Sequence, residues 1–274
     1  MTASTDEVGV VVDGFDWSGF ALVSITSLLA AAILMVITAA FGFRWGRHNV
    51  VDVSWGAGFV LIALIAAAFG DGDAWRRWLL AGLVAVWGLR LASHMARRSS
   101  GHGEDPRYKR MLDDAGGNRT LTAIRKIYLT QGLALWFVSL PVQVSAVTHG
   151  SLGVFTAVGA VLWLVGVMFE SVGDAQMSAF KADPSNRGTI MDRGLWGWTR
   201  HPNYFGDACV WWGIYLIAAQ TWPGVLTAAS PLAMTYFLVY ATGARLLEQH
   251  MAERPGYREY QARTSYFLPR PPRP

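Results

Sequence analysis

The chain has 274 residues, of which 53% are hydrophobic and only 15% are charged, and its mean hydropathy is +0.29. Soluble domains carry about 25% charged residues, so this composition excludes an ordinary soluble domain and favours a polytopic membrane protein. The formal net charge is +4, but no basic stripe is interleaved with aromatic residues, so we expect no nucleic-acid partner. Cys209 is the single cysteine, which excludes an internal disulfide and a multi-cysteine zinc site; we expect no metal centre.

Seven apolar segments are near the length of about 20 residues that a helix needs to cross a bilayer. Because backbone groups cannot stay unpaired in lipid, such segments must form helices. We therefore predict an all-α fold with seven transmembrane helices, at residues 18–43, 51–70, 74–96, 124–147, 153–173, 203–220 and 223–246. The predicted organisation is a short extracytoplasmic N-terminus, a transmembrane domain with long polar loops on one side, and a cytoplasmic tail, at residues 1–17, 18–246 and 247–274.

Lysine and arginine are distributed unevenly over the connections between these segments. Twenty of the 23 fall in residues 43–50, 96–126, 174–201 and from 245 onward. The other side has none in its N-terminal segment or its later turns, and only Arg76 and Arg77 lie near it. The positive-inside rule therefore predicts an N-terminus outside and a C-terminus in the cytoplasm.

The first charged residue inside a predicted span is Asp52, in the stretch NVVDVSWG at the start of the second span. An acid there is either a helix-start residue favoured by the helix dipole or part of a site. The third span ends in a polar stripe that contains Arg90, His94 and Arg97. His94 is a candidate proton donor because histidine titrates near working pH. The loop that follows adds Arg107 and Tyr108.

The fifth span ends in FESVGDAQMSAFKADPSNRG. Glu170 and Asp174 are four residues apart, on one helical face at the membrane boundary. Lys181 shares that face if the helix continues, and Asn186 and Arg187 follow a proline-containing turn. A solvated loop would explain the last three residues, but it explains the two acids less well.

The sixth span begins in GLWGWTRHPNYFGDACVWWG, where Pro202 suits the first turn of a helix. An interface belt would explain Arg200, His201 and Tyr204. It does not explain Asp207, because a carboxylate inside an apolar helix is costly and usually faces a partner or a cavity. Helix N-termini also suit phosphates and carboxylates. We therefore predict a ligand site formed by one helical face, which carries Arg200, Asn203, Tyr204 and Asp207.

The last span leads into a basic tail, where Arg245, Glu248 and His250 precede three tyrosines. A juxtamembrane amphipathic helix explains the tail but explains Arg245 and Glu248 less well. No Rossmann, P-loop, zincin or nucleophile-elbow motif is present. A nucleotide, if one binds, would therefore occupy a site built from membrane helices.

The stretches FKADPSNRGTIMDRGLWGWTRHPNYFGDACVWWGIYL and SPLAMTYFLVYATGARLLEQHMAERPGYREYQARTSYFLP resemble the DUF1295 family. That family is similar to the C-terminal domain of steroid 5-alpha-reductases. NVVDVSWG and EDPRY also resemble DUF1295 segments, so the resemblance covers roughly residues 45–270.

Steroid 5-alpha-reductases are seven-helix membrane enzymes that use NADPH to reduce a C=C bond conjugated to a ketone. Their pattern of an acid, a base seven residues later, a Gly-Leu-aromatic turn, an Asn and a second acid matches Asp174, Lys181, Gly194-Leu195-Trp196, Asn203 and Asp207. The resemblance implies a cofactor role for these side chains, and by position for Arg107, Arg245 and His250. The chain departs from the reductases at Val51-Asp52, where they have Gln-Glu, and at His94, where they have Tyr.

The first functional hypothesis is an NADPH-dependent reductase of a lipophilic enone that enters from the bilayer. The expected catalytic residues are Asp52, His94 and Tyr108, with His94, aided by Asp52, protonating the substrate. The expected cofactor-binding residues are Arg97, Arg107, Asp174, Lys181, Asn186, Arg187, Arg200, His201, Asn203, Tyr204, Asp207, Arg245, Glu248 and His250.

Two other hypotheses remain open. A membrane methyltransferase that uses S-adenosylmethionine would share the R-H-P-N-Y element, although Glu248-Gln249 stands where such enzymes show a Glu-Glu pair. A non-enzymatic lipid-binding or scaffold protein is disfavoured by Asp52 and Asp207. The sequence leaves the oligomeric state open, and a monomer is plausible.

Overall fold

The computed structural model describes residues 15–101, 103–241 and 243–272. Within these residues every regular element is a helix and none is a strand. Six helical stretches are long and apolar enough to cross a membrane, namely Trp17–Trp45, Val50–Phe69, Ala74–Ser99, Arg119–Ser145, Val154–Ala182 and Gly224–Met251. An all-helical membrane fold is therefore confirmed. The predicted extracytoplasmic N-terminus lies outside the described residues except for its last three.

Four of the six stretches are single helices, namely α1 (Trp17–Trp45), α2 (Val50–Phe69), α3 (Ala74–Ser99) and α8 (Val154–Ala182). The carboxylate of Asp16 caps α1 by accepting from the backbone N–H groups of Ser18 and Gly19. α8 continues well beyond the expected end near residue 173. The apolar pattern stops there, but the polar residues that follow it still form helix. Asp174 and Lys181 consequently lie on one continuous helix.

The other two stretches are broken. The fourth expected span consists of α5 (Arg119–Ala123), the π-helical η1 (Ile124–Leu129), α6 (Thr130–Val138) and α7 (Leu140–Ser145). Its break at Ser139 precedes Pro141, which occupies the first turn of α7. The last span consists of η3 (Gly224–Ala228), α11 (Ala229–Tyr236), the π-helical η4 (Phe237–Ala241) and α12 (Ala244–Met251).

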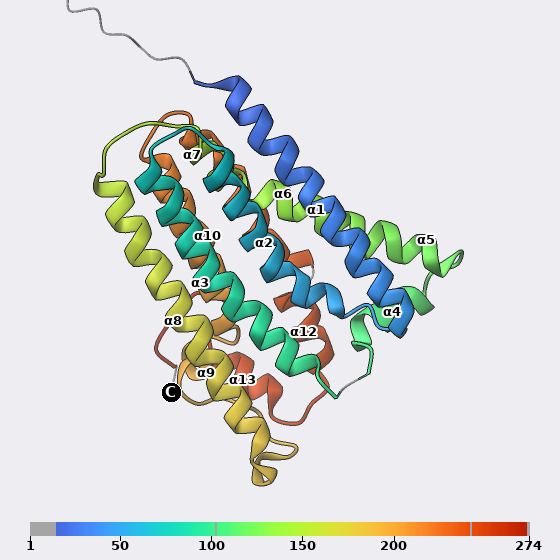
Figure 1. Ribbon diagram of the computed structural model, residues 1–274. Coiled ribbons are helices and arrows are strands. Elements are labelled where there is room, and N and C mark those ends of the chain that lie inside the picture. The colour runs from blue at the N-terminus through green and yellow to red at the C-terminus, as the bar shows by residue number, and fades with distance from the viewer. Residues whose placement is uncertain (1–14, 102, 242, 273–274) are drawn as a thin grey trace, which may run out of the picture.

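The sixth expected span corresponds to α10 (Pro202–Ala219), with Pro202 in its first turn as predicted. α10 is not among the six stretches, and it carries Asn203 and Asp207. Most of its length is buried, because it contacts α3, α7, α8 and α11. The helix therefore lies inside the bundle rather than at its edge (Figure 1).

Facing glycines bring α8 and α10 unusually close. A Cβ on Gly166 would lie 2.5 Å from the carbonyl oxygen of Gly206, and one on Gly206 would lie 2.5 Å from that of Gly166. About two helical turns away, Gly159 and Gly213 face each other in the same way, at 2.6 Å in both directions. Small residues at such positions let helix backbones approach closely in membranes. The two helices therefore pack backbone against backbone.

Four of the short helices lie together at one end of the bundle, here called the α13 end (Figure 1). They are α4 (Pro106–Asp113), η2 (Pro184–Asn186), α9 (Leu195–Trp198) and α13 (Tyr257–Arg263). At the opposite α7 end, three connections meet around the fully buried Arg76. Its guanidinium donates to the hydroxyls of Thr148 and Thr221 and to the carbonyl of Gly150.

The middle of the bundle is an aromatic core. The rings of Phe59 and Trp211 have centroids 4.4 Å apart, and Trp87 meets Trp211 edge-on at 5.5 Å. The indole N–H of Trp87 then donates to Glu170 at 2.9 Å. The apolar core therefore ends directly at a charged group, on the side of the α13 end.

Candidate functional site

A charged cluster joins α3 to α8 just beyond the aromatic core. Arg90 donates to Glu170 at 2.6 Å and also to Asp174. The Nε2 atom of His94 lies 3.6 Å from Asp174. Glu170 is almost fully buried, with 4% of its side chain exposed. One arginine is therefore the principal counter-charge for two carboxylates, and we call these four residues the Arg90 cluster.

α10 adds polar groups to the same region. The amide of Asn203 donates to Asp174 at 3.4 Å. Asp207 is buried, and one of its carboxylate oxygens has no hydrogen-bond partner among the described residues. Because Gly206 brings the backbone of α10 against that of α8 at Glu170, Asp207 lies within electrostatic range of the Arg90 cluster. The structure thus leaves a buried acceptor open beside an acidic cluster.

A second group of polar residues joins α2 to α4. The hydroxyl of Tyr108 donates to Asp52 at 2.6 Å, and Arg107 lies 3.5 Å from the same carboxylate. Arg107 is held in turn by Asp105, which accepts from its guanidinium at 3.0 Å. Asp105 also caps α4, by accepting from the backbone N–H of Arg107 at 2.8 Å. The cap therefore sets the position of both side chains that contact Asp52.

Asp52 is not needed to cap its own helix. The carboxylate of Glu104, in the loop before α4, accepts from the backbone N–H groups of His48 and Asn49 at 2.5 and 3.1 Å. These two groups lie at the entry to α2, where unpaired donors need a partner. Because Glu104 satisfies them, Asp52 is left to bind Tyr108.

The environment of α4 keeps both partners of Asp52 protonated. Burial raises the pKa of Tyr108 well above its ordinary value, and the negative charge of Asp52 and its hydrogen bond raise it further. Burial alone would lower the pKa of Arg107, but the hydrogen bond to Asp105 and the charge of Asp52 raise it on balance. Tyr108 is therefore a neutral hydrogen-bond donor at working pH.

Three cations, Arg98, Lys181 and Arg254, lie close to one another near the Arg90 cluster and the Asp52–Tyr108 pair. Arg98, at the end of α3, acts electrostatically on Asp52, His94 and Lys181. Arg254, in the connection before α13, also acts on Lys181. All three cations are solvent-exposed, and none forms an ion pair within 4 Å among the described residues. Exposed cations that approach one another without paired acids suit a polyanion such as a phosphate chain.

Tyr204 links the two polar groups. It is on α10, one turn before Asp207, and lies within electrostatic range of Arg107, Asp52 and Asp207. Its ring stacks on that of His201, with centroids 5.6 Å apart and an interplanar angle of 13°. The tyrosine therefore lies near both Asp207 and the Asp52–Tyr108 pair.

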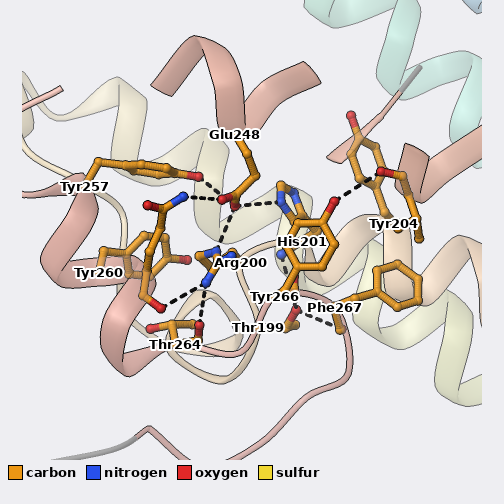
Figure 2. A network of polar contacts seen from close by, with 12 residues as sticks. Thr199, Arg200, His201, Tyr204, Glu248, Tyr257, Tyr260, Thr264, Tyr266 and Phe267 are labelled. Atoms are coloured by element: carbon orange, nitrogen blue, oxygen red, sulfur yellow. Dashed lines mark hydrogen bonds and ion pairs between the residues drawn. The ribbon is translucent and has the colours of Figure 1, made fainter. Parts of the chain in front are cut away.

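Arg200 and His201 belong to a different network, shown in Figure 2. Both donate to Glu248, at 2.8 and 3.1 Å. Tyr257 and Gln261, on α13, donate to the same carboxylate. Arg200 also donates to the carbonyl oxygens of Gln261 and Thr264. We call Arg200, His201, Glu248, Tyr257 and Gln261 the C-terminal clasp, because they fasten the C-terminal segment to the start of α10.

The remaining predicted residues lie nearer the surface. Asn186 donates to the carbonyl of Phe180 at 3.0 Å and lines a cavity of about 300 Å³ between the end of α8 and the next loop. Arg187 and Arg245 are exposed, and His250 lies 3.4 Å from Arg110. Arg97 is exposed and acts electrostatically on His94. Within the described residues, no group of three or more His, Cys, Asp or Glu side chains is arranged to hold a metal.

Four residues near the site were not among the predicted site residues. Arg90 and Glu170 were visible as polar residues near span ends, but their pairing joins positions 80 residues apart. Arg98 has the appearance of an ordinary positive-inside residue, and Arg254 lies in a basic tail. No local pattern distinguishes these cations from solvated ones.

The fold and these clusters define a polytopic helical membrane protein with a charged site at one end of its bundle. A family model described as "Protein of unknown function (DUF1295)" matches residues 38–264, and the chain therefore belongs to the DUF1295 family, as its sequence indicated. It is also similar to "Uncharacterized protein C594.04c" of Schizosaccharomyces pombe (strain 972 / ATCC 24843), with 24% identity over 232 residues. The match covers 71% of this chain and 64% of that protein, so the chain spans just under two thirds of its relative.

Proposed function

We propose that this protein is a membrane-embedded, NADPH-dependent reductase of a C=C bond in a lipophilic enone. The observation that carries the proposal is the 2.6 Å hydrogen bond between Tyr108 and Asp52, next to the exposed cations Arg98 and Lys181. A neutral phenol held by a carboxyl group can hydrogen-bond a substrate carbonyl. The resemblance of these segments to steroid 5-alpha-reductases supports the same chemistry.

The residues present fit the cofactor. Lys181, Arg98 and Arg107 supply positive charge for its phosphates, and Asn203 and Tyr204 supply polar groups for a ribose or an amide. The open oxygen of the buried Asp207 suits a donor such as the carboxamide N–H₂ of nicotinamide. When bound, NADPH supplies a hydride to the β-carbon of the substrate.

The protein's own residues would handle the charge that develops on the substrate. As the hydride adds to the β-carbon, the electron pair of the C=C bond moves toward the carbonyl oxygen. The single O–H of Tyr108 donates to Asp52 in the structure; with substrate bound it would turn to that carbonyl oxygen, while Asp52 in its protonated form would donate to the phenol oxygen and hold Tyr108 in place. Tyr108 would pass its proton to the enolate oxygen and regain one from Asp52, which water reprotonates; the enol then takes a proton at its α-carbon as it loses the one on oxygen, which gives the saturated ketone. Tyr108 is the stronger candidate for the donor because His94 lies beside Asp174, whereas Tyr108 contacts Asp52 directly.

We also propose that α10 is a seventh span, with the α13 end in the cytoplasm. Support comes from the connections at its two ends. Thr221 shares the guanidinium of Arg76 with Gly150 at the α7 end, whereas Arg200, just before α10, joins the clasp at the α13 end. The cation-rich loops all lie at the α13 end, which the positive-inside rule assigns to the cytoplasm. Cofactor would then reach the site from the cytoplasm, and substrate from the bilayer.

The first experiment is a thermal-unfolding comparison of detergent-purified protein with NADPH, NADH and S-adenosylmethionine. A ligand that binds the folded protein raises its unfolding temperature by mass action. We expect stabilisation by NADPH and none by S-adenosylmethionine. Stabilisation by S-adenosylmethionine alone would replace the reductase with a methyltransferase, and stabilisation by none of the three would favour a non-enzymatic protein.

A further inference from the structure

A groove of about 460 Å³ lies between the ends of α1, α2 and α3. On α2 it is lined by Val50, Val53 and Ser54, whereas Asp52 contacts Tyr108 on α4. Side chains at these spacings occupy opposite faces of a helix. The groove is therefore separate from the candidate active site, with the start of α2 between them.

The walls of the groove are effectively apolar. α1 contributes Leu34, Ile37 and Phe41. The hydroxyls of Thr38 and Ser54, along its length, bond each other at 2.8 Å, and Thr38 also donates to the carbonyl of Leu34. Nearer the end of the groove, the hydroxyl of Ser99 donates to the carbonyl of Met95 at 2.7 Å. Because these hydroxyls are already paired, the groove has no strong attraction for a polar ligand along its length. It suits a flexible hydrocarbon chain.

The polar end of the groove is cationic. Arg47 lines it and donates from Nη2 to the carbonyl of Ser99 at 2.7 Å. The Nε atom of Arg47 is buried without a hydrogen-bond partner, and no carboxylate of a described residue lies within ion-pair distance of it. Arg44 is in the last turn of α1 nearby. No lining residue is acidic, so the groove has at one end a positive charge that no carboxylate of its lining neutralises.

Trp45 also lines the groove and is 60% exposed. It indicates how deep in the membrane this end of the groove lies. Tryptophans of this kind sit at the membrane–water interface, where phospholipid headgroups are found. The cytoplasmic leaflet is rich in anionic lipids, which attract basic residues near the membrane. An apolar channel with a cation at headgroup level matches one molecule of such a lipid.

We propose that this groove binds an anionic phospholipid of the surrounding bilayer, with an acyl chain along Leu34, Ile37 and Phe41 and the phosphate on Arg47. The site does not depend on the reductase activity. It would fix α1 to α2 and α3 through the lipid.

The test compares unfolding temperatures of detergent-purified protein titrated with dioleoyl-phosphatidylglycerol or dioleoyl-phosphatidylcholine. We expect the wild type to respond to phosphatidylglycerol at lower concentration. Arg47→Gln should weaken that response about fivefold, the effect of one basic residue at a membrane surface, and leave the phosphatidylcholine response unchanged. Ala96→Trp, which fills the groove from its exposed α3 wall, should weaken both responses. Arg125→Gln removes an exposed cation outside the groove and should behave as the wild type.

Phosphatidylglycerol with brominated acyl chains gives a second measurement, because bromine quenches a tryptophan that it contacts. The chain has 13 tryptophans, so we expect Trp45→Phe to remove the part of the quenching that is specific to this site, and Ala96→Phe, which fills the groove without adding a tryptophan, to reduce the same part. An equal response of the wild type to the two lipids, or a loss in Arg125→Gln as large as in Arg47→Gln, overturns the proposal. If Ala96→Trp abolishes turnover while the wild type shows no preference for phosphatidylglycerol, the groove belongs to the substrate, and the lipid proposal is wrong.

Discussion

Tyr108 combines three properties that suit a phenol which stays neutral at working pH and can donate a hydrogen bond. Its hydroxyl contacts a carboxylate, its ring is half-buried, and its pKa is held well above the ordinary value by burial and by Asp52. A raised pKa favours the protonated phenol, so the group stays neutral through physiological pH and loses its proton only in strong alkali. Each property depends on α4 and on its cap at Asp105.

The first prediction separates the two candidate donors. Tyr108→Phe should reduce turnover of an enone by about 100-fold or more, because it removes a donor to a developing oxyanion, while NADPH binding stays within a few-fold. The rate of the wild type should not fall between about pH 7 and 9 through ionisation of Tyr108. Steady-state kinetics of Tyr108→Phe and His94→Ala provide the check. If only His94→Ala loses activity, His94 is the donor and Tyr108 is structural.

The second prediction concerns Arg90. Its removal leaves two carboxylates without their principal counter-charge, and breaking a buried ion pair from one side costs about 3–5 kcal/mol. We expect Arg90→Ala to be strongly destabilised or absent from the membrane fraction. Arg119→Ala is the matched control, because Arg119 pairs with Asp113 at the same kind of distance, 2.8 Å, but on the surface. Such pairs contribute at most about 1 kcal/mol. Equal stability of the two variants would show that the Arg90 cluster is not a structural ion pair.

The buried acids could be predicted from sequence, because a carboxylate in an apolar helix has few roles other than binding something. Their partners could not. Asp52 and Tyr108 are 56 residues apart, and Arg200 and Glu248 are 48 apart. The sequence predicts Arg200 as a cofactor-binding residue, and in the structure its donors hold the C-terminal clasp. Whether it also contacts a cofactor stays a prediction.

At the scale of elements, apolar run length was sufficient to predict every long helix, because lipid forces uninterrupted runs into helices. It did not indicate where helices change geometry. The fourth and last spans contain π-helical turns at η1 and η4, which arise from local backbone bonding rather than from composition. It also missed the extension of α8, whose last turns are polar.

The third prediction tests the close approach of α8 and α10. Gly206→Ala places a Cβ 2.5 Å from the carbonyl oxygen of Gly166, and neither backbone can yield without separating the helices. We expect a loss of about 1–3 kcal/mol, as for other overpacked sites. Gly82→Ala, in α3, is the control because nothing lies within 4 Å of its added Cβ. Helix propensity should make it neutral or slightly stabilising. Chemical or thermal unfolding of both variants measures the difference, and equal stability would contradict the packing.

At the scale of the whole molecule, the two arginines on the wrong side of the charge pattern have a structural reason. Arg77 donates to the carbonyl oxygens of Ala67 and Gly70, which end α2, and Arg76 is enclosed by hydroxyls and a carbonyl. Cations are favourable at helix C-termini. Both side chains are therefore held by the fold, which explains why they do not follow the positive-inside pattern.

The fourth prediction concerns topology. In a background without the native thiol (Cys209→Ala), single cysteines replace the exposed Ser151, Arg187 or Trp222. With seven spans and a cytoplasmic α13 end, a membrane-impermeant maleimide should label positions 151 and 222 in intact cells, and position 187 only after permeabilisation. Labelling of 187 and 222 on the same side would mean that α10 does not cross the membrane. Labelling of 187 alone in intact cells would reverse the orientation.

The facing glycines of α8 and α10 also have a consequence for recognition. Asp174 is on one of these helices and Asn203 and Asp207 are on the other, so their spacing is set by a backbone contact that no side-chain rotation can relax. A ligand that binds across them meets a surface whose shape exists before it arrives, and little conformational entropy is lost on that side. The affinity of this wall for the part of the ligand that contacts it should therefore depend little on how ordered the surrounding loops are. Discrimination between related ligands would come from rigid shape rather than from adjustment.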